Sequence, residues 1–397
     1  MLPARAEVLV VGGGIVGLTV ARELALAGRP GVVIVEKEPE LGLHASGRNS
    51  GVLHAGVYYA PDTLRARSCL DGNRLLRAFC REQGLPLLEG GKVIVAREER
   101  ELPALEELFR RASANGARVE WLDERQLPDV EPRARTVQRA LWSRDTAAVD
   151  PKAVLRALRA DLEARGVLLL TGCRFLGLEG PGRARTSLGP VAFARLVNAA
   201  GAFCDVVARA FGVGREYRLV PFKGIYRKLR PGASFEVRGN VYPVPDPRNP
   251  FLGVHFTRSA QGEVWLGPTA IPALGRENYG ILAGAGREAA GIALADLSLF
   301  LSNPGFRSVA LSEPRKYLAR FFHRDAARLV NGYDPSLFVA AEKVGIRPQL
   351  VDWRTKALVM DFLVEARDGS VHVLNPISPA FTASMALAKR LVADHFG

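Results

Sequence analysis

The start of the chain limits its fold more than any other part. An apolar run at residues 8–11 leads into a glycine-rich segment, residues 12–17. A helix is predicted over residues 18–27, and a second apolar run, residues 31–35, ends at Glu36. Strand, glycines, helix, strand and acid follow one another in the order of a dinucleotide-binding β-α-β unit. A β-α-β unit that holds no ligand is the alternative interpretation.

Each conspicuous residue of this unit has a physical reason. Gly12 permits a tight turn, Gly14 lets the backbone approach a pyrophosphate, and Gly17 lets the helix pack closely on the sheet. The N–H groups at the start of the helix attract the negative pyrophosphate. Glu36 is placed to accept hydrogen bonds from ribose hydroxyls, and its charge would repel a 2′-phosphate. The unit therefore predicts a nucleotide that lacks this phosphate.

The composition is that of a soluble enzyme. At 397 residues the chain is long enough for two domains, and 48% of its residues are apolar and 24% charged. No uninterrupted apolar run reaches the roughly eighteen residues that a transmembrane helix needs. The chain leads almost directly into the first strand, which leaves no room for a signal peptide. We therefore expect a cytoplasmic protein.

The formal net charge of +13 predicts anionic partners. The arginines are scattered rather than gathered in a basic tail, so we expect no nucleic-acid binding. A small dicarboxylate substrate fits this charge, and so does peripheral contact with the inner face of an anionic membrane. Four widely spaced cysteines form no CxxC pair, which predicts buried thiols and neither a metal site nor a disulfide framework: Cys69, Cys80, Cys173 and Cys204.

Hydrophobic periodicity and turn residues predict the other elements. The predicted helices cover residues 63–83, 98–115, 151–165, 205–211, 283–302, 314–328 and 381–395. Strands are predicted at residues 92–96, 167–170, 193–198 and 371–374, and an antiparallel sheet is predicted between residues 220 and 267. Because nucleotide-binding parts alternate with other segments, we expect discontinuous domains.

The loop at residues 46–59 distinguishes two cofactor classes. A nicotinamide dehydrogenase would continue with another regular β-α unit, whereas this loop resembles the flavin-contacting segment of FAD-dependent oxidoreductases related to D-amino-acid oxidase and glycerol-3-phosphate dehydrogenase. Residues 197–203 resemble the strand and turn near the adenosine in that superfamily, and residues 375–383 resemble its C-terminal turn and helix start beneath the flavin. The resemblance covers essentially the whole chain.

Four motifs narrow the resemblance to L-2-hydroxyglutarate oxidases, also called dehydrogenases. They lie at residues 49–59, 242–247, 251–258 and 267–270. The resemblance implies oxidation of L-2-hydroxyglutarate to 2-oxoglutarate, with hydride transfer from C2 to flavin N5. It implies an α/β fold in which a Rossmann-like FAD-binding domain of the glutathione-reductase type is interleaved with an antiparallel-sheet substrate domain. We predict the first domain over residues 1–85, 146–215 and 340–397, and the second over residues 86–145 and 216–339.

The resemblance also implies how a 2-hydroxy acid is held. His54 and His255 stand in family-like motifs, and an imidazole can accept the hydroxyl proton near neutral pH. We favour His54 slightly because its loop is expected closest to the flavin ring. Arg347, expected just after a late strand, corresponds to an arginine that binds substrate carboxylate. Further candidates for substrate contacts are Arg258 and Lys223, for the distal carboxylate, and Tyr59.

The candidate FAD contacts follow from the motifs above. The start of the last helix is expected to face the flavin pyrimidine with its positive end, and Phe175 is expected near adenine. The residues are Gly12, Gly14, Ile15, Val16, Gly17, Glu36, Lys37, Ser46, Arg48, Asn49, Ser50, Gly51, Phe175, Ala200, Gly201, Pro379, Ala380, Phe381 and Thr382. We expect noncovalent FAD, with oxygen or a membrane quinone as electron acceptor. A related flavoenzyme for glycerol 3-phosphate or an amino acid, or a noncatalytic flavin-binding scaffold, is the alternative.

Overall fold

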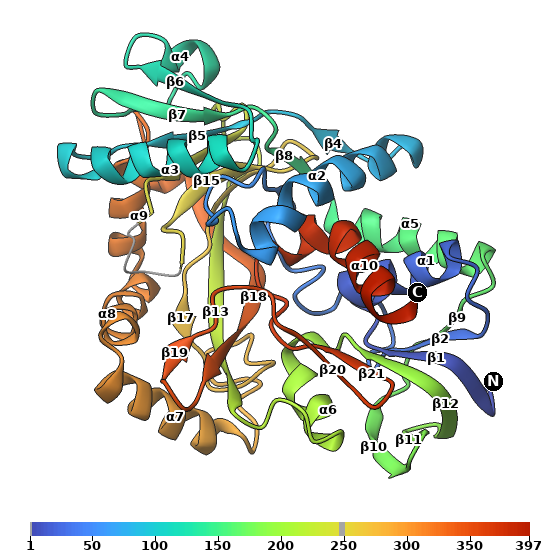
Figure 1. The fold of residues 1–397 in the computed structure, drawn as a ribbon. Coiled ribbons are helices and arrows are strands. Elements are labelled where there is room, and N and C mark those ends of the chain that lie inside the picture. The colour runs from blue at the N-terminus through green and yellow to red at the C-terminus, as the bar shows by residue number, and fades with distance from the viewer. Residues whose placement is uncertain (1, 246–250) are drawn as a thin grey trace.

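A computed structural model describes residues 2–245 and 251–397, so residues 246 and 247 of the motif at 242–247 lie outside the described residues. Two large sheets dominate the fold (Figure 1). The first sheet has eight strands and runs β10-β11-β12-β1-β2-β9, with β21 beside β12 and β20 beside β21. Its strands are β1 (Arg5–Val11), β2 (Val32–Val35), β9 (Leu168–Leu170), β10 (Phe175–Gly180), β11 (Arg183–Thr186), β12 (Gly189–Asn198), β20 (Val364–Arg367) and β21 (Ser370–Val373).

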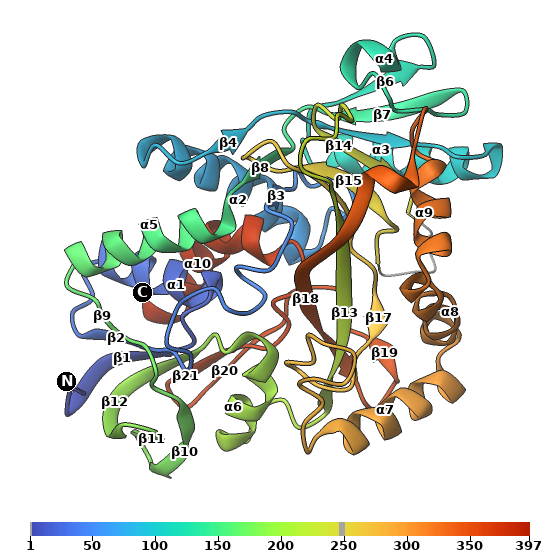
Figure 2. The ribbon, with the colours of Figure 1, turned by 180° about the vertical axis from the view of Figure 1, so that it is seen from behind.

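The centre of the first sheet is parallel and buried on both faces. The strands β12, β1, β2 and β9 run parallel, with Val10 of β1 opposite Val197 and Ile34. Three helices pack on one face and share its core, and Figure 2 shows them together: α1 (Ile15–Leu26), α5 (Pro151–Ala164) and α10 (Ala380–Phe396). The helix α6 (Cys204–Ala210) packs on the other face. Helices on both faces explain why these strands are almost entirely apolar.

The second sheet has ten strands and runs β19-β18-β13-β16-β15-β14-β5-β7-β6, with β17 beside β13. Its pairs are antiparallel except for β14 and β5. Its strands are β5 (Lys92–Val95), β6 (Val119–Asp123), β7 (Arg139–Ser143), β13 (Tyr217–Leu229), β14 (Asn240–Pro243), β15 (His255–Arg258), β16 (Val264–Gly267), β17 (Ile271–Pro272), β18 (Phe338–Asp352) and β19 (Ala357–Leu358). A small third sheet joins β3 (Val52–Leu53), β4 (Leu87–Leu88) and β8 (Ala147–Val149).

The remaining helices lie at the edges of the second sheet and between the sheets. They are α2 (Leu64–Glu82), α3 (Leu102–Ala114), α4 (Leu127–Val130), α7 (Ala289–Ser302), α8 (Pro304–Ser312) and α9 (Ala319–Ala327). The predicted mixed fold with a parallel nucleotide-binding sheet and a separate, mainly antiparallel sheet is confirmed. The domain boundaries stay a prediction.

Several end signals of the helices are confirmed. The Thr63 side chain caps α2 by accepting a hydrogen bond from the Ala66 N–H, and Gly84 follows that helix with a φ of +61°. Asp150 caps α5 in the same way, and Gly166 follows it with a φ of +77°. Positive φ is open to glycine at little cost, so both helices end where the sequence predicts. All four cysteines are buried free thiols.

Two predicted helices differ from the structure, and α8 and the strand β18 are missing from the prediction. The helix expected from residue 283 begins at Ala289, because Gly284 needs a φ of +83° just before it. The helix α8 is unpredicted, and the helix expected over residues 314–328 is interrupted at Leu318, whose ψ of 115° is extended. The long strand β18 is unpredicted too, since Pro348 is unusual within a strand. Arg347 therefore lies inside a strand rather than after one.

The helices α7, α8 and α9 run along the outer side of the ten-stranded sheet, away from α1 (Figures 1 and 2). Large apolar side chains of α7 point to solvent: Leu294, Leu297 and Leu301 are 68%, 54% and 67% exposed. Ile281, Leu282, Leu311 and Leu318 are exposed nearby. Among the described residues, no helix has the length and apolar character to cross a membrane.

Candidate active site

Two neighbouring cavities lie where the loops and helix starts next to the first sheet meet the strands of the second sheet. The first, of about 460 Å³, lies at the ends of β1 and β2 and beside the start of α1. The second, of about 290 Å³, lies between the start of α10 and the strands β13 to β18. Both are lined by Gly14, Ala45, Ser46, Ala199, Gly201 and Ile346. Together they form one elongated site. We call the first cavity the nucleotide cavity and the second the reaction cavity.

The glycines at the nucleotide cavity are needed for close packing. Gly12 has a φ of +112°, and a methyl group added there would approach the Ala199 carbonyl oxygen to 2.5 Å. A methyl group at Gly17 would collide with the Gly12 carbonyl oxygen. Gly14 is the N-cap of α1 and offers no side-chain cap, which leaves donors at the helix start available to an anion.

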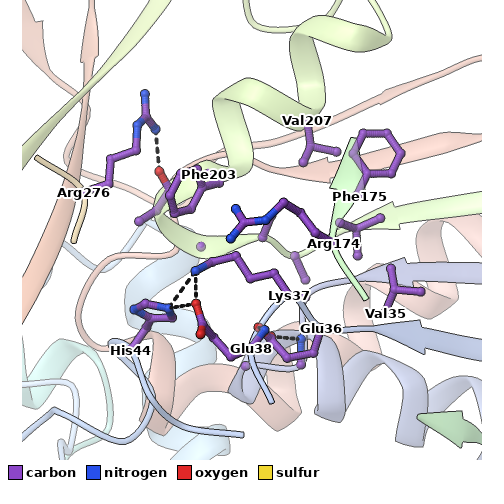
Figure 3. Close-up of a pocket in the computed structure, with 18 of the residues that line it drawn as sticks. Val35, Glu36, Lys37, Glu38, His44, Arg174, Phe175, Phe203, Val207 and Arg276 are labelled. Carbon is purple, nitrogen blue, oxygen red and sulfur yellow. Dashed lines mark hydrogen bonds and ion pairs between the residues drawn. The ribbon is translucent and has the colours of Figure 1, made fainter. Parts of the chain in front are cut away.

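Glu36 organises the glycine turn from the end of β2. One carboxylate oxygen accepts a hydrogen bond from the Gly13 N–H at 2.8 Å, and the other accepts one from the Glu38 N–H at 2.9 Å. Each carboxylate oxygen can accept more than one hydrogen bond, so both retain capacity for ribose hydroxyls. Glu36 lines the nucleotide cavity, as do Lys37 and Phe175 (Figure 3). Ala200 lines it as well.

A charged cluster borders the nucleotide cavity at Lys37. The Lys37 ammonium contacts carboxylates of Glu38 and Glu277 and lies 2.9 Å from Nε2 of His44, and Figure 3 shows the first and last of these neighbours. The Lys37 hydrogen bond lowers the pKa of Glu38 to about 2. Glu38, His44 and Glu277 are close enough together to hold a metal ion, but the Lys37 ammonium already supplies the positive charge among them.

The loop after β2 is held by its own polar groups. The Ile15 N–H donates to Ser46 Oγ at 2.9 Å, and the Asn49 amide bridges the Ser46 carbonyl and the Gly51 N–H. Arg48 Nε donates to the Leu43 carbonyl at 2.6 Å. Of the predicted FAD contacts in this loop, Ser46, Arg48, Asn49 and Ser50 line the reaction cavity, whereas Gly51 does not.

The start of α10 faces the reaction cavity. Pro379, Ala380, Phe381 and Thr382 all line it, together with Ile15 and Val16 from the start of α1. The Thr382 hydroxyl oxygen accepts a hydrogen bond from the His54 N–H at 3.1 Å, which ties the helix to the loop after β3. A helix N-terminus carries partial positive charge, so this end of the cavity favours a negative group.

Two imidazoles line the same cavity. Nδ1 of His255 lies 2.8 Å from the Gly253 carbonyl oxygen, and its ring stacks on Tyr242 at 3.7 Å between centroids. A carbonyl oxygen can only accept, so Nδ1 carries the hydrogen and Nε2 has the free electron pair. Burial lowers the pKa of His255 to about 3. Burial, and next to it the charge of Lys92, lowers the pKa of His54 well below its ordinary value.

Arg347, on β18, brings a positive charge to the wall of the reaction cavity. Its guanidinium stacks over the Phe251 ring at 4.6 Å and donates to Gln349 Oε1 at 3.3 Å. Burial lowers its pKa to about 9, so it remains charged at neutral pH. Further along β18, the Leu350 N–H donates to Asn375 Oδ1 at 3.3 Å, which joins the strand to the turn before α10. His54, His255 and Arg347 thus share one cavity, as the sequence predicts.

Lys223 and Arg258 lie outside this cavity. The Lys223 ammonium donates to the Gly280 carbonyl, and Arg258 donates to the Val237 carbonyl at 3.5 Å. Alternate residues of a strand face opposite sides. Phe222 and His255 line the cavity, so Lys223, one residue on, and Arg258, three residues on, point away from it.

Two other predicted residues do not line either cavity. Tyr59 is buried beneath the Arg65 guanidinium, 4.4 Å from its ring centroid. Gly17 acts through packing of α1 on β1. Sequence reasoning missed Tyr242, which lines the reaction cavity, and Lys92, which is buried behind it on β5. Lys92 could have been found from the sequence, because it is a charged residue at the first position of the apolar strand predicted at residues 92–96.

Comparison with known proteins identifies the family of this chain. A family described as FAD dependent oxidoreductase matches residues 7–394. The chain belongs to this family, and its cofactor is FAD.

Its similar relatives are more particular. L-2-hydroxyglutarate dehydrogenase of Caenorhabditis briggsae is 36% identical, over 98% of this chain and 92% of the relative. The protein of that name from Indibacter alkaliphilus is 33% identical over 96% of both chains, and the mitochondrial one of Homo sapiens is 33% identical over 98% of this chain and 88% of the relative. Among solved structures, L-alpha-glycerophosphate oxidase from Mycoplasma pneumoniae with FAD bound has a TM-score of 0.76 at 22% identity, covering 98% of this chain and 94% of the other.

Proposed function

We propose that this chain oxidises L-2-hydroxyglutarate to 2-oxoglutarate. The observation that carries the proposal is the reaction cavity, where two unprotonated imidazoles and a charged guanidinium meet beside the start of α10. Relatives named L-2-hydroxyglutarate dehydrogenase, aligned over almost the whole chain, support the choice of substrate.

FAD fits the elongated site. The glycine turn and the start of α1 suit the pyrophosphate, Glu36 suits the ribose, and the start of α10 suits a negatively charged flavin pyrimidine. The chemistry supplied by bound FAD is acceptance of the hydride from C2 of the substrate. We expect noncovalent attachment, which is tested by release of FAD on denaturation.

We assign the substrate carboxylate at C1 to Arg347. A guanidinium binds a carboxylate through two parallel hydrogen bonds, which fixes the orientation of C2. We assign the hydroxyl proton to Nε2 of His255, because the Gly253 carbonyl keeps the free electron pair at this atom. The geometry thus favours His255 over His54, because Nδ1 of His54 has no hydrogen bond among the described residues that would fix which ring nitrogen carries the hydrogen.

Anaerobic flavin reduction tests the function directly. The holoprotein is mixed with L-2-hydroxyglutarate, its D-enantiomer, glycerol 3-phosphate or an amino acid, and flavin absorbance is followed at about 450 nm. We expect bleaching by the L-enantiomer alone. Bleaching by glycerol 3-phosphate or an amino acid would favour the related flavoenzymes, and no bleaching by any compound would favour a scaffold.

We further propose that the exposed leucines of α7 rest on an anionic lipid surface. Leu294, Leu297 and Leu301 form one apolar stripe on α7. Exposed arginines precede α7 and follow it on α8, α9 and the turn between them: Arg287, Arg307, Arg315, Arg320 and Arg324. Apolar side chains among basic ones are typical of helices that bind at the lipid interface. A membrane quinone would then be within reach as electron acceptor, with oxygen as the alternative.

Liposome flotation tests the lipid contact. The holoprotein should float with vesicles that contain phosphatidylglycerol and much less with vesicles of phosphatidylcholine alone. Replacing Leu294, Leu297 and Leu301 by serine should abolish flotation without changing flavin reduction in solution. Equal flotation of this variant and the wild type would refute the assignment of the surface, and reduction of a quinone analogue compared with oxygen identifies the acceptor.

A further inference from the structure

Lys92 is a buried cation without a conventional partner. It is the first residue of β5 and is 1% exposed. Within residues 2–245 and 251–397, its ammonium makes no hydrogen bond and no ion pair. Lysine is almost never fully buried unless it is paired. Because burial of an unpaired ammonium is unfavourable, we expect a role for Lys92 in the reaction cavity next to it.

The neighbours of Lys92 are two tyrosine rings, and each stands next to a histidine. The ammonium lies 4.4 Å from the centroid of Tyr58 and 5.1 Å from that of Tyr242. Tyr242 stacks on His255, and Tyr58 meets His54 edge to face at 6.4 Å. Lys92 is therefore one aromatic ring behind both imidazoles of the reaction cavity.

The other charged and titratable groups around this cluster add no negative charge at neutral pH. Arg65 and Cys69 face it from α2, Tyr59 faces it from the loop after β3, and Arg347 faces it from β18. Burial raises the pKa of Cys69 to about 12, so this thiol stays neutral. Nδ1 of His54 and the Tyr58 hydroxyl are likewise buried without a hydrogen bond among the described residues. The positive charge of Lys92 thus acts on the histidines without compensation.

We propose that Lys92 is a positioning residue of the oxidation, whose charge adds to burial in opposing protonation of His54 and His255 and so keeps them able to accept the hydroxyl proton. This inference rests on the proposed function. Like charges disfavour one another in a buried site, so an ammonium next to an imidazole opposes formation of a second cation.

The direction of the pH dependence follows from the charges. Burial lowers the pKa of Lys92 to about 7, so the residue is charged in acid solution, where an imidazole would otherwise take up a proton. Removing the charge raises the pKa of both histidines. The rate then falls at a higher pH than in the wild type. Above about pH 8 Lys92 is neutral, and its removal has little effect through charge.

Three variants separate the charge from the fold. Lys92→Met removes the charge, Lys92→Arg keeps it at every pH, and Lys343→Met is the matched control. Lys343, on β18 of the same sheet, is half-buried and lies 5.3 Å from the Tyr226 ring and 5.0 Å from the Trp265 ring. Among the described residues these two rings contact each other and no histidine ring. The rate of anaerobic flavin reduction by L-2-hydroxyglutarate is measured from about pH 3 to about pH 8 for each holoprotein.

The acid side of the Lys92→Met profile should lie about one pH unit above that of the wild type, which corresponds to a shift of about one pKa unit, and the rate relative to that at about pH 8 should approach a tenfold deficit at the acid end of the range. Lys92→Arg and Lys343→Met should keep the acid side of the wild-type profile. Superimposable profiles for Lys92→Met and the wild type would overturn the proposal. If Lys92→Met does not fold, an acid side in Lys92→Arg displaced toward higher pH would overturn it as well.

A measurement without substrate separates this inference from the proposed function. The pKa values of His54 and His255 are read from nitrogen chemical shifts of the ¹⁵N-histidine-labelled holoprotein. They should rise in Lys92→Met and stay low in Lys92→Arg. If they rise while L-2-hydroxyglutarate fails to bleach the flavin, the proposed substrate fails and the role of Lys92 in holding the histidines neutral stands. Unchanged values in Lys92→Met would refute that role.

Discussion

The buried ion pair between Arg276 and Asp205 holds the segment after β17 against the nucleotide cavity. Asp205 is 2% exposed, and its Oδ2 lies 3.0 Å from Arg276 Nη2. The same guanidinium donates to the Ala202 carbonyl in the cavity wall and contacts Glu288 at 2.8 Å. Asp205→Asn would remove the buried partner of Arg276 and leave only the half-buried Glu288 to balance its charge.

Breaking a buried pair from one side costs about 3–5 kcal/mol of unfolding free energy. Glu288, which is 38% exposed, still contacts Arg276, so we expect the lower end of this range, about 3 kcal/mol. The loss is measured by chemical denaturation of the holoprotein, and FAD release is followed in parallel by flavin fluorescence. We expect faster release, because Arg276 and Ala202 line the nucleotide cavity.

The matched control for this variant is Glu107→Gln on α3, which removes an exposed pair with Arg110 at 2.8 Å. Exposed pairs contribute little to stability, so the control should match the wild type in both measurements. If Asp205→Asn has the same unfolding free energy and the same rate of FAD release as the control, the buried pair does not contribute the expected stability.

Three further predictions concern the reaction and nucleotide cavities. Gly17→Ala places a methyl group against the Gly12 carbonyl, so the purified protein should carry less FAD, as measured by the ratio of flavin to protein absorbance. Arg347→Met should lower the second-order rate of flavin reduction by about a hundredfold, and Arg347→Lys should recover part of it, because truncating one partner of a buried charge pair costs about 2–5 kcal/mol. His255→Asn should reduce the rate of flavin reduction far more than His54→Asn. A larger loss of rate in His54→Asn would show that His54 is the base instead.

Local signals in the sequence predict the nucleotide cavity well. The turn at Gly12, the close contact at Gly17 and the acid at Glu36 all depend on residues within one β-α-β unit. The role of a glycine with positive φ, or of a carboxylate at the end of a strand, depends only on neighbouring residues of the same β-α-β unit. Such features are therefore legible without knowledge of the rest of the fold.

The reaction cavity depends on the register of distant strands, which the sequence does not specify. Lys223 and Arg258 point away from the cavity because the odd and even positions of β13 and β15 face opposite sides. His255 pairs with Gly267 across the sheet, and Arg347 pairs with Phe222. Only these pairings decide which side chain of each strand faces the cavity. The role of Lys92 follows from the same sheet, where β5 lies beside β14.

The hydrogen bond between Leu350 and Asn375 has a consequence for the range of substrates. It links the strand that bears Arg347 to the turn that leads into α10. The carboxylate anchor and the helix start are therefore joined through the Asn375 side chain, which is fully buried and held in place. A variant that accepts a longer 2-hydroxy acid should thus be sought by reshaping Tyr242, which lines the same cavity, while Arg347, the Phe251 ring that it stacks on and α10 are left unchanged.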